Sequence, residues 1–130
     1  MLETIDIQGS GFNVLKDYNS WRIATLGYDK NSNSKEGIKG LGRHLETIEV
    51  FVLIEGNAYM ITAGYDSEPS KATIEKLEQG KLFVVQEKQW HGAVLEPGSR
   101  LLIIENRNTS SINSENYVMS SEYKKQLNMT

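Results

Sequence analysis

The feature that most restricts the fold of this chain is a series of short apolar runs separated by turn signals. The clearest pair is EVFVLIE at residues 49–55 and AYMITA at residues 58–63, joined by Gly56-Asn57. β-Branched and aromatic residues fill both runs, which favours strands, and a Gly-Asn pair between them is typical of a tight hairpin turn. The sequence therefore predicts a β-hairpin over residues 49–63.

Further runs of the same kind follow at a spacing of about ten residues, and no long helical pattern lies between them. They predict strands at residues 20–28, 72–77, 82–86, 92–95 and 100–105. Short strands at this spacing are typical of an all-β sandwich or barrel. The polar, glycine-rich residues 29–42 are predicted to be a loop, and the Asn/Ser-rich residues 106–116 an exposed segment. Residues 120–127 are predicted to form a short helix capped by Ser120 or Ser121.

The length of 130 residues fits one domain, which we place at residues 1–130 with its core at about 20–106. The N-terminal segment and the C-terminal tail would flank that core.

A net charge of −3 offers little attraction to nucleic acid or to an anionic membrane, so we expect neither as a partner. No stretch approaches the roughly 20 apolar residues that span a bilayer, and the first residues lack a basic start followed by an apolar run. We expect a cytoplasmic protein.

The chain has no cysteine, which excludes disulfides and thiolate metal sites. A metal ion would therefore be bound by histidine, carboxylate or water ligands. The chain has two histidines, His44 and His91, and each lies beside a predicted strand. Glu49 opens the strongest strand run, five residues after His44. The three residues are candidate metal ligands through the family resemblance that they carry.

Two segments resemble the two halves of the cupin signature: GLGRHLETIEVFVLIEG at residues 40–56 and GKLFVVQEKQWH at residues 80–91. His44, Glu49 and Gly56 match the second histidine, the glutamate and the glycine of the first half. Gly80 and His91 match the second half. The chain departs from the pattern at Gly42, which replaces the first histidine; residues 86–88 replace the usual Pro-x-Gly, and Leu95 replaces an asparagine.

This resemblance implies an antiparallel jelly-roll barrel or sandwich of the RmlC-like type, with a divalent metal bound by His44, Glu49 and His91. Two imidazoles and one carboxylate suit iron, manganese, nickel or zinc, with open positions for water or a substrate. Cupins often pair as homodimers through exposed strands, so a homodimer is expected here too. The resemblance covers residues 20–106.

Strand alternation predicts which residues surround such a site. If Glu49 points inward, Phe51 and Leu53 do so too, and His91 shares a face with Ala93 and Leu95. The cavity would then be mostly apolar. Four residues are candidates for the ligand pocket on weaker grounds, namely Phe51, Tyr59, Gln86 and Trp90. A large aromatic residue such as Trp90 is more often part of a core or a dimer interface.

The sequence is compatible with three functions. The first is a metal-dependent enzyme that acts on a small polar molecule. The second is a non-catalytic binding module without a metal, which the missing histidine at Gly42 favours. The third is a metal-free isomerase or epimerase that uses His44 or His91 as a base. Each candidate ligand also has a purely structural alternative, because isolated histidines are commonly hydrogen-bonded structural residues and glutamates usually lie on the surface.

Overall fold

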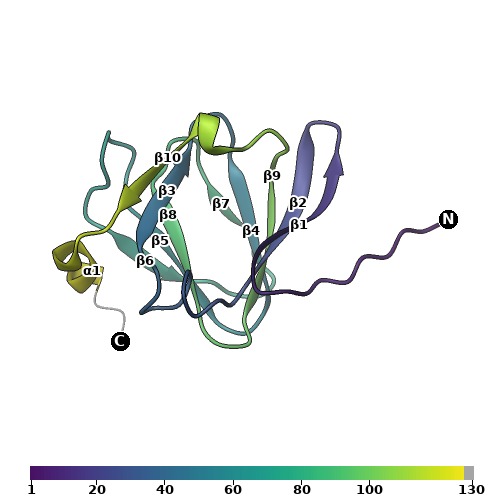
Figure 1. Cartoon of the computed structure of the whole chain (residues 1–130), viewed down its shortest axis with the longest axis horizontal. Helices are drawn as coiled ribbons and strands as arrows, with labels where there is room; N and C mark the ends of the chain where they lie inside the picture. The colour runs from purple at the N-terminus through teal and green to yellow at the C-terminus, as the bar shows by residue number, and fades with distance from the viewer. Residues whose placement is uncertain (128–130) are drawn as a thin grey trace.

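The structure is a computed structural model that describes residues 1–127, in which ten strands form two facing sheets (Figure 1). The strands are β1 (Gly11–Tyr18), β2 (Trp21–Gly27), β3 (Gly40–His44), β4 (Glu49–Glu55), β5 (Ala58–Thr62), β6 (Thr73–Lys76), β7 (Phe83–Val85), β8 (His91–Leu95), β9 (Arg100–Asn106) and β10 (Ser114–Val118). A short 3-10 turn, η1 (Ser111–Asn113), precedes β10, and a helix, α1 (Ser121–Leu127), follows it.

The first sheet has the strand order β1-β2-β9-β4-β7, and the second has the order β10-β3-β8-β5-β6. Every strand pairing in the two sheets is antiparallel. Neighbours such as β4 and β9 lie far apart in sequence, so the chain crosses repeatedly between the sheets. The expected all-β sandwich with a short C-terminal helix is confirmed.

The main core lies between the two sheets and is built by strand alternation. On β4, Phe51 and Leu53 are buried while the residues between them are partly exposed. They pack against Leu101 and Ile103 of β9 and against Met60 of β5. The predicted inward face of β4 is therefore confirmed, and that face begins with Glu49, which is also buried.

The turn between β4 and β5 requires glycine at position 56. Gly56 has a φ of +80°, and a Cβ there would lie 2.2 Å from Ser99 Oγ. That hydroxyl accepts a hydrogen bond from the Asn57 backbone N–H at 2.8 Å. The turn is thus tied to the start of β9, which fixes the crossing from the first sheet to the second.

A second apolar cluster lies on the outer face of the second sheet. Ile61, Trp90 and Val94 pack there against Met119 and Leu127. Leu127 belongs to α1, which begins after Ser120; the Ser120 Oγ accepts a hydrogen bond from the Tyr123 N–H at 3.0 Å. The predicted helix and its cap are confirmed.

Within residues 1–127, no helix has the length and apolar character needed to cross a membrane.

The predicted strands between residues 20 and 106 are all present, with ends that shift by one or two residues. Three further strands were not predicted. β3 lies at the end of the segment predicted as a loop, and β10 overlaps the segment predicted to be exposed. β3 carries two glycines, β10 is mostly polar, and β1 is almost entirely exposed, so their sequences show little of the usual strand signal. They are strands because neighbouring strands pair with them.

Candidate metal centre

His44, Glu49 and His91 meet at one end of the sandwich, although they come from three strands. His44 ends β3, Glu49 begins β4 and His91 begins β8. The two histidines therefore belong to the second sheet and the glutamate to the first. One ligand atom of each residue lies within 4.8 Å of the others.

The distances fit a set of ligands around one ion. Glu49 Oε1 lies 2.8 Å from His91 Nε2 and 3.2 Å from His44 Nε2. Ligand atoms bound about 2.1 Å from a shared ion and at right angles to each other are about 3 Å apart. The distances from Glu49 Oε1 to the two imidazole nitrogens match this spacing, and all three donor atoms lie within 4.8 Å of one another.

The other nitrogen of each ring is hydrogen-bonded within the protein. His91 Nδ1 lies 3.0 Å from the carbonyl oxygen of Gln89, and His44 Nδ1 lies 2.8 Å from Ser114 Oγ. A carbonyl can only accept, so His91 Nδ1 carries the proton and a neutral ring presents its Nε2 lone pair to Glu49. Two lone pairs facing each other at 2.8 Å need a proton or a cation between them. Metal-bound histidines are oriented in this way.

The pKa values of Glu49 and His44 are shifted in opposite directions. Burial by itself would raise the pKa of the Glu49 carboxyl, but the close contacts with His44 and His91 hold that pKa well below its usual range. Burial lowers the pKa of His44, and the bond to Glu49 outweighs it, so the pKa is raised overall. Glu49 is therefore an anion at neutral pH, ready to balance a cation.

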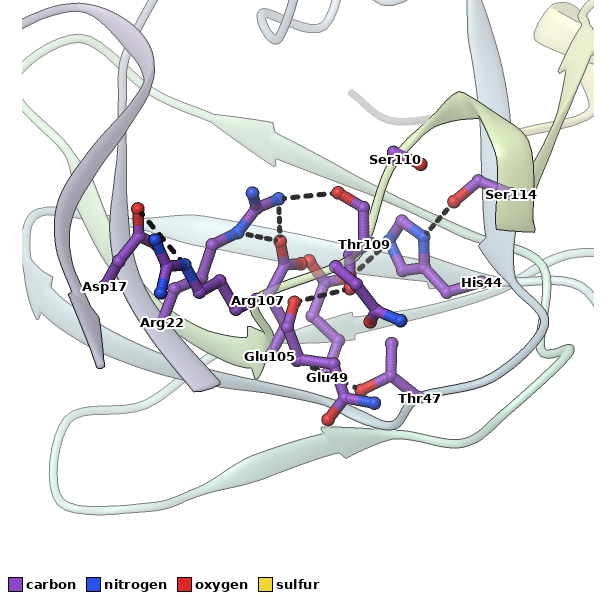
Figure 2. A network of polar contacts seen from close by, with 12 residues as sticks. Asp17, Arg22, His44, Thr47, Glu49, Glu105, Arg107, Thr109, Ser110 and Ser114 are labelled. Atoms are coloured by element: carbon purple, nitrogen blue, oxygen red, sulfur yellow. Dashed lines mark hydrogen bonds and ion pairs between the residues drawn. The ribbon is translucent and has the colours of Figure 1, made fainter. Parts of the chain in front are cut away.

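A fourth buried group, Glu105, lies beside Glu49 on the adjacent strand β9 (Figure 2). Burial, together with the neighbouring Glu49 carboxylate, raises the pKa of Glu105 to about 7. Arg22 donates from Nε to Glu105 Oε2 at 2.7 Å and also contacts it through Nη2, which donates in addition to the Thr109 carbonyl at 3.2 Å. An arginine, a buried carboxyl and the candidate ligand thus form one continuous network.

Glu105, Arg22 and Ser114 were not among the site residues predicted from the sequence. The signal for Glu105 was present, because the alternation that turns Leu101 and Ile103 inward turns Glu105 inward as well. Arg22 lies on the same face of β2 as Ala24 and Leu26. Ser114 could not be found this way, because its place beside His44 depends on the pairing of β10 with β3.

The candidate site opens on a cavity of about 630 Å³ that extends along the open end of the sandwich. Besides the two histidines, its inner wall is apolar, with the residues Leu26, Phe51, Ala93 and Ile103. Polar side chains of Asn31, Ser32 and Asn116 lie around its outer part. Phe51 also contacts the His91 ring edge-on, with ring centroids 6.0 Å apart.

The structure brings one of the four weaker pocket candidates, Phe51, to this cavity. Tyr59 points to the other side of the second sheet, where it lines a separate cavity of about 670 Å³ with Tyr28 and Glu96. Trp90 is buried in the second apolar cluster, under the guanidinium of Arg43, which lies 4.5 Å from the ring centroid.

The last candidate, Gln86, is exposed in the turn before β8, and its N–H donates to the Gln89 side chain at 2.9 Å. This turn stands where the resemblance expects Pro-x-Gly. Lys88 has a φ of +66° within it, and its N–H donates to the carbonyl of His44 at 2.7 Å. The Gln89 carbonyl then accepts from His91. The turn therefore connects both histidines without lining the cavity.

Gly42 occupies the position of the missing histidine and lies on the same face of β3 as His44, two residues away. It pairs with His91 of β8 on one side and with Asn116 of β10 on the other. A Cβ at this position would meet Asn116 Oδ1 at 3.3 Å. The departure from the cupin pattern thus leaves a three-residue site, and Gly42 lines the adjacent cavity without a side chain.

No family model matches the sequence, and no curated protein matches it either. Solved structures do resemble the fold. An RmlC-like cupin from Shewanella frigidimarina is 20% identical with a TM-score of 0.55, and covers 84% of this chain and 87% of its own. KdgF from Halomonas sp. is 15% identical with a TM-score of 0.56, over 85% and 91% of the two chains. A 3,4-ketoisomerase from Helicobacter canadensis is 14% identical with a TM-score of 0.57, over 83% and 75%.

These structures share the two-sheet arrangement over most of both chains, at identities that establish the fold alone. The two antiparallel five-stranded sheets agree with that fold. This chain has the cupin fold, a small antiparallel jelly roll with a short C-terminal helix.

Proposed function

We propose that this protein binds one divalent first-row metal ion through His44 Nε2, Glu49 Oε1 and His91 Nε2, and that the site binds or transforms a small molecule in the adjacent cavity. The observation that carries this proposal is the convergence of two Nε2 atoms on one carboxylate oxygen, with both Nδ1 atoms hydrogen-bonded elsewhere. Iron, manganese, nickel and zinc all accept this donor set.

The protein supplies three ligands and leaves the remaining positions of an ion open. When bound, such an ion supplies a Lewis acid that polarises an oxygen atom of a ligand or of water. The residues of the chain hold the ion, exclude water on the side of Leu26, Phe51 and Ile103, and offer amide groups at the outer part of the cavity. A small molecule with one oxygen-bearing end and an apolar body fits this lining.

The metal-free isomerase is less well supported. A general base must direct a free lone pair at its substrate. Here both Nε2 atoms point at Glu49, and the Nδ1 atoms contact Gln89 and Ser114. Neither ring therefore presents an unengaged nitrogen to the cavity.

The reaction itself stays open, because proteins of this fold carry different activities. The resembling structures include a 3,4-ketoisomerase and KdgF, and these names describe those proteins. A homodimer, a cytoplasmic location, a single domain over residues 1–130 and the absence of a nucleic-acid partner stay predictions.

Equilibrium dialysis of the purified protein against Mn²⁺, Fe²⁺, Ni²⁺ or Zn²⁺, followed by elemental analysis, tests the proposal. We expect about one equivalent of ion per chain. Glu49→Gln and the double variant His44→Ala, His91→Ala should weaken binding by at least about 100-fold, since each removes charge or ligands. Glu46→Gln, an exposed carboxylate three residues from Glu49, is the matched control. Binding that is absent in the wild type, or unchanged in Glu49→Gln, would overturn the proposal.

A further inference from the structure

Asn116 lies beside Gly42, where the cupin pattern has a histidine and this chain has no side chain. The register of β10 with β3 pairs Asn116 with Gly42, as it pairs Ser114 with His44. Side chains of directly paired residues lie on the same face of a sheet. The 2.8 Å contact between Ser114 Oγ and His44 Nδ1 shows this for one pair (Figure 2). Asn116 therefore shares the face of His44, and its Oδ1 lies 3.3 Å from the position of a Gly42 Cβ.

The side chain of Asn116 is not engaged by the rest of the fold. Within residues 1–127 its amide makes no hydrogen bond, and the residue is exposed where it lines the cavity of the metal centre. Asn113 differs, because its Oδ1 accepts from the Ser110 N–H at 2.9 Å and its Nδ2 donates to the Asn108 carbonyl at 3.0 Å. An amide offers an acceptor oxygen and two donor hydrogens, so Asn116 presents both kinds of group to the cavity.

The amide of Asn116 is placed to contact a molecule bound to the ion rather than the ion itself. Neighbouring strands are about 4.8 Å apart, and β10 lies one strand farther from His91 than β3 does. An asparagine side chain is also shorter than a histidine side chain, so an amide on β10 ends short of the point that an imidazole at position 42 would reach. Because Gly42 has no side chain, a molecule on the ion can extend past it and meet the amide.

The charges around the cavity favour an anionic ligand. Of the described residues that line it, none is acidic, and Lys39 carries a positive charge. Glu49 balances one of the two charges of a divalent ion, so the loaded site is net positive. A carboxylate complements this charge. It also has two oxygens, one for the ion and one that can accept from an amide N–H.

We propose that Asn116 is a specificity-determining residue, which donates from Nδ2 to a carboxylate of the ligand while the ion binds the other oxygen of the same group. The body of that ligand lies against the apolar wall that includes Phe51 and Ile103. The ligand class is thus a small monocarboxylate with an aliphatic body. This inference rests on the proposed metal site and adds a residue that lies outside both segments resembling the cupin signature.

Isothermal titration with 4-methylpentanoate tests the proposal, on protein loaded with the ion that equilibrium dialysis identifies. Asn116→Ala should raise the Kd of 4-methylpentanoate by about tenfold or more, because a hydrogen bond to a charged group is lost. The Kd of the ion should not change, since Asn116 is not one of its ligands. Asn108→Ala, at an exposed asparagine that does not line the cavity, is the matched control and should bind both as the wild type does.

Asn116→Asp separates a direct contact from a structural role. Aspartate keeps the shape of asparagine, has no donor hydrogens when ionised and carries a negative charge. Its Kd for 4-methylpentanoate should rise at least as far as that of Asn116→Ala, with an unchanged circular dichroism spectrum.

The outcomes distinguish this inference from the proposed function. A wild type that binds the ion but not 4-methylpentanoate, or equal Kd values for 4-methylpentanoate in the wild type and both Asn116 variants, would overturn the inference and leave the metal site standing. A loss of ion affinity in Asn116→Ala would make Asn116 a metal ligand and would also overturn it. A wild type that takes up none of the four ions would overturn the proposed function and this inference together.

Discussion

At the scale of single residues, the site depends on groups that orient the ligands as much as on the ligands. His91 is oriented by the Gln89 carbonyl and His44 by Ser114 Oγ, while Glu49 lies between both rings and Glu105. Each contact fixes which atom of a ligand faces the ion position. Two predictions follow from removing one such contact at a time.

Replacing Ser114 by alanine should weaken metal binding by about 10- to 100-fold, because His44 loses the partner that fixes its ring. Competition with a chelator of known affinity measures this change. Ser111→Ala, an exposed serine three residues away, is the control and should bind as the wild type. Equal affinity of Ser114→Ala and the wild type would show that β3 alone orients the ring.

Glu105 should make the stability of the metal-free protein depend on pH. Its pKa is about 7 in the folded chain against 4.5 for the free side chain, so the folded state binds more protons between these values. The contribution of Glu105 to the free energy of unfolding should therefore fall as the pH rises from 4.5 to 7. Glu105→Gln imitates the protonated form and should lose this dependence.

Urea unfolding of metal-free wild type and Glu105→Gln at several pH values measures the effect. Glu75→Gln, on the exposed strand β6, should keep the wild-type profile. Parallel profiles for the wild type and Glu105→Gln would show that Glu105 is ionised throughout the range.

At the scale of elements, strand pairing explains why three ligands separated by up to 47 positions come together. β3 holds His44 next to β8, and β4 holds Glu49 opposite, across the sandwich. β3 gains its place from β10 on one side and β8 on the other. Gly42, which has no side chain, is therefore paired with both neighbouring strands.

The missing imidazole at position 42 predicts that adding one will raise the affinity for a metal ion. Gly42→His should add a third imidazole on the face that carries His44 and raise the affinity for zinc or nickel by about tenfold or more. Asn116 has to move by a few tenths of an ångström, since its Oδ1 lies 3.3 Å from the new Cβ. Gly42→Asn fills the same space without an imidazole and is the control. Isothermal titration with metal compares the two variants, and equal affinities would contradict the prediction.

At the scale of the whole molecule, the candidate ligands connect the two sheets. His44 and His91 belong to the second sheet and Glu49 to the first, so a bound ion resists their separation. A ligand that binds the folded state alone stabilises it by about 2.7 kcal/mol at 100 times its Kd. For a chain of this length, that free energy raises Tm by about 10 °C.

Thermal unfolding with and without added ion measures this coupling. The wild type should show the rise in Tm and lose it with excess chelator, whereas the variant His44→Ala, His91→Ala should show neither. An equal rise in the double variant would place the ion elsewhere on the chain.

The sequence by itself determined the all-β class, most strands of the core and the three candidate ligands. Alternation within EVFVLIE and within residues 91–95 is a local property, so the inward faces that carry Glu49 and His91 could be predicted from it. The cupin resemblance added His44, which has no strand signal of its own.

Only the tertiary structure decided the rest, because it depends on pairings between distant residues. Gly40–His44 becomes a strand through β8 and β10, Ser114 reaches His44 across that pairing, and Glu105 meets Glu49 through the register of β4 with β9. Tyr59 and Trp90 lie on the other side of the second sheet. Tyr59 lines the separate cavity there, and Trp90 is buried in the second apolar cluster. A local pattern shows which side chains share a face; the packing of the sheets determines what that face meets.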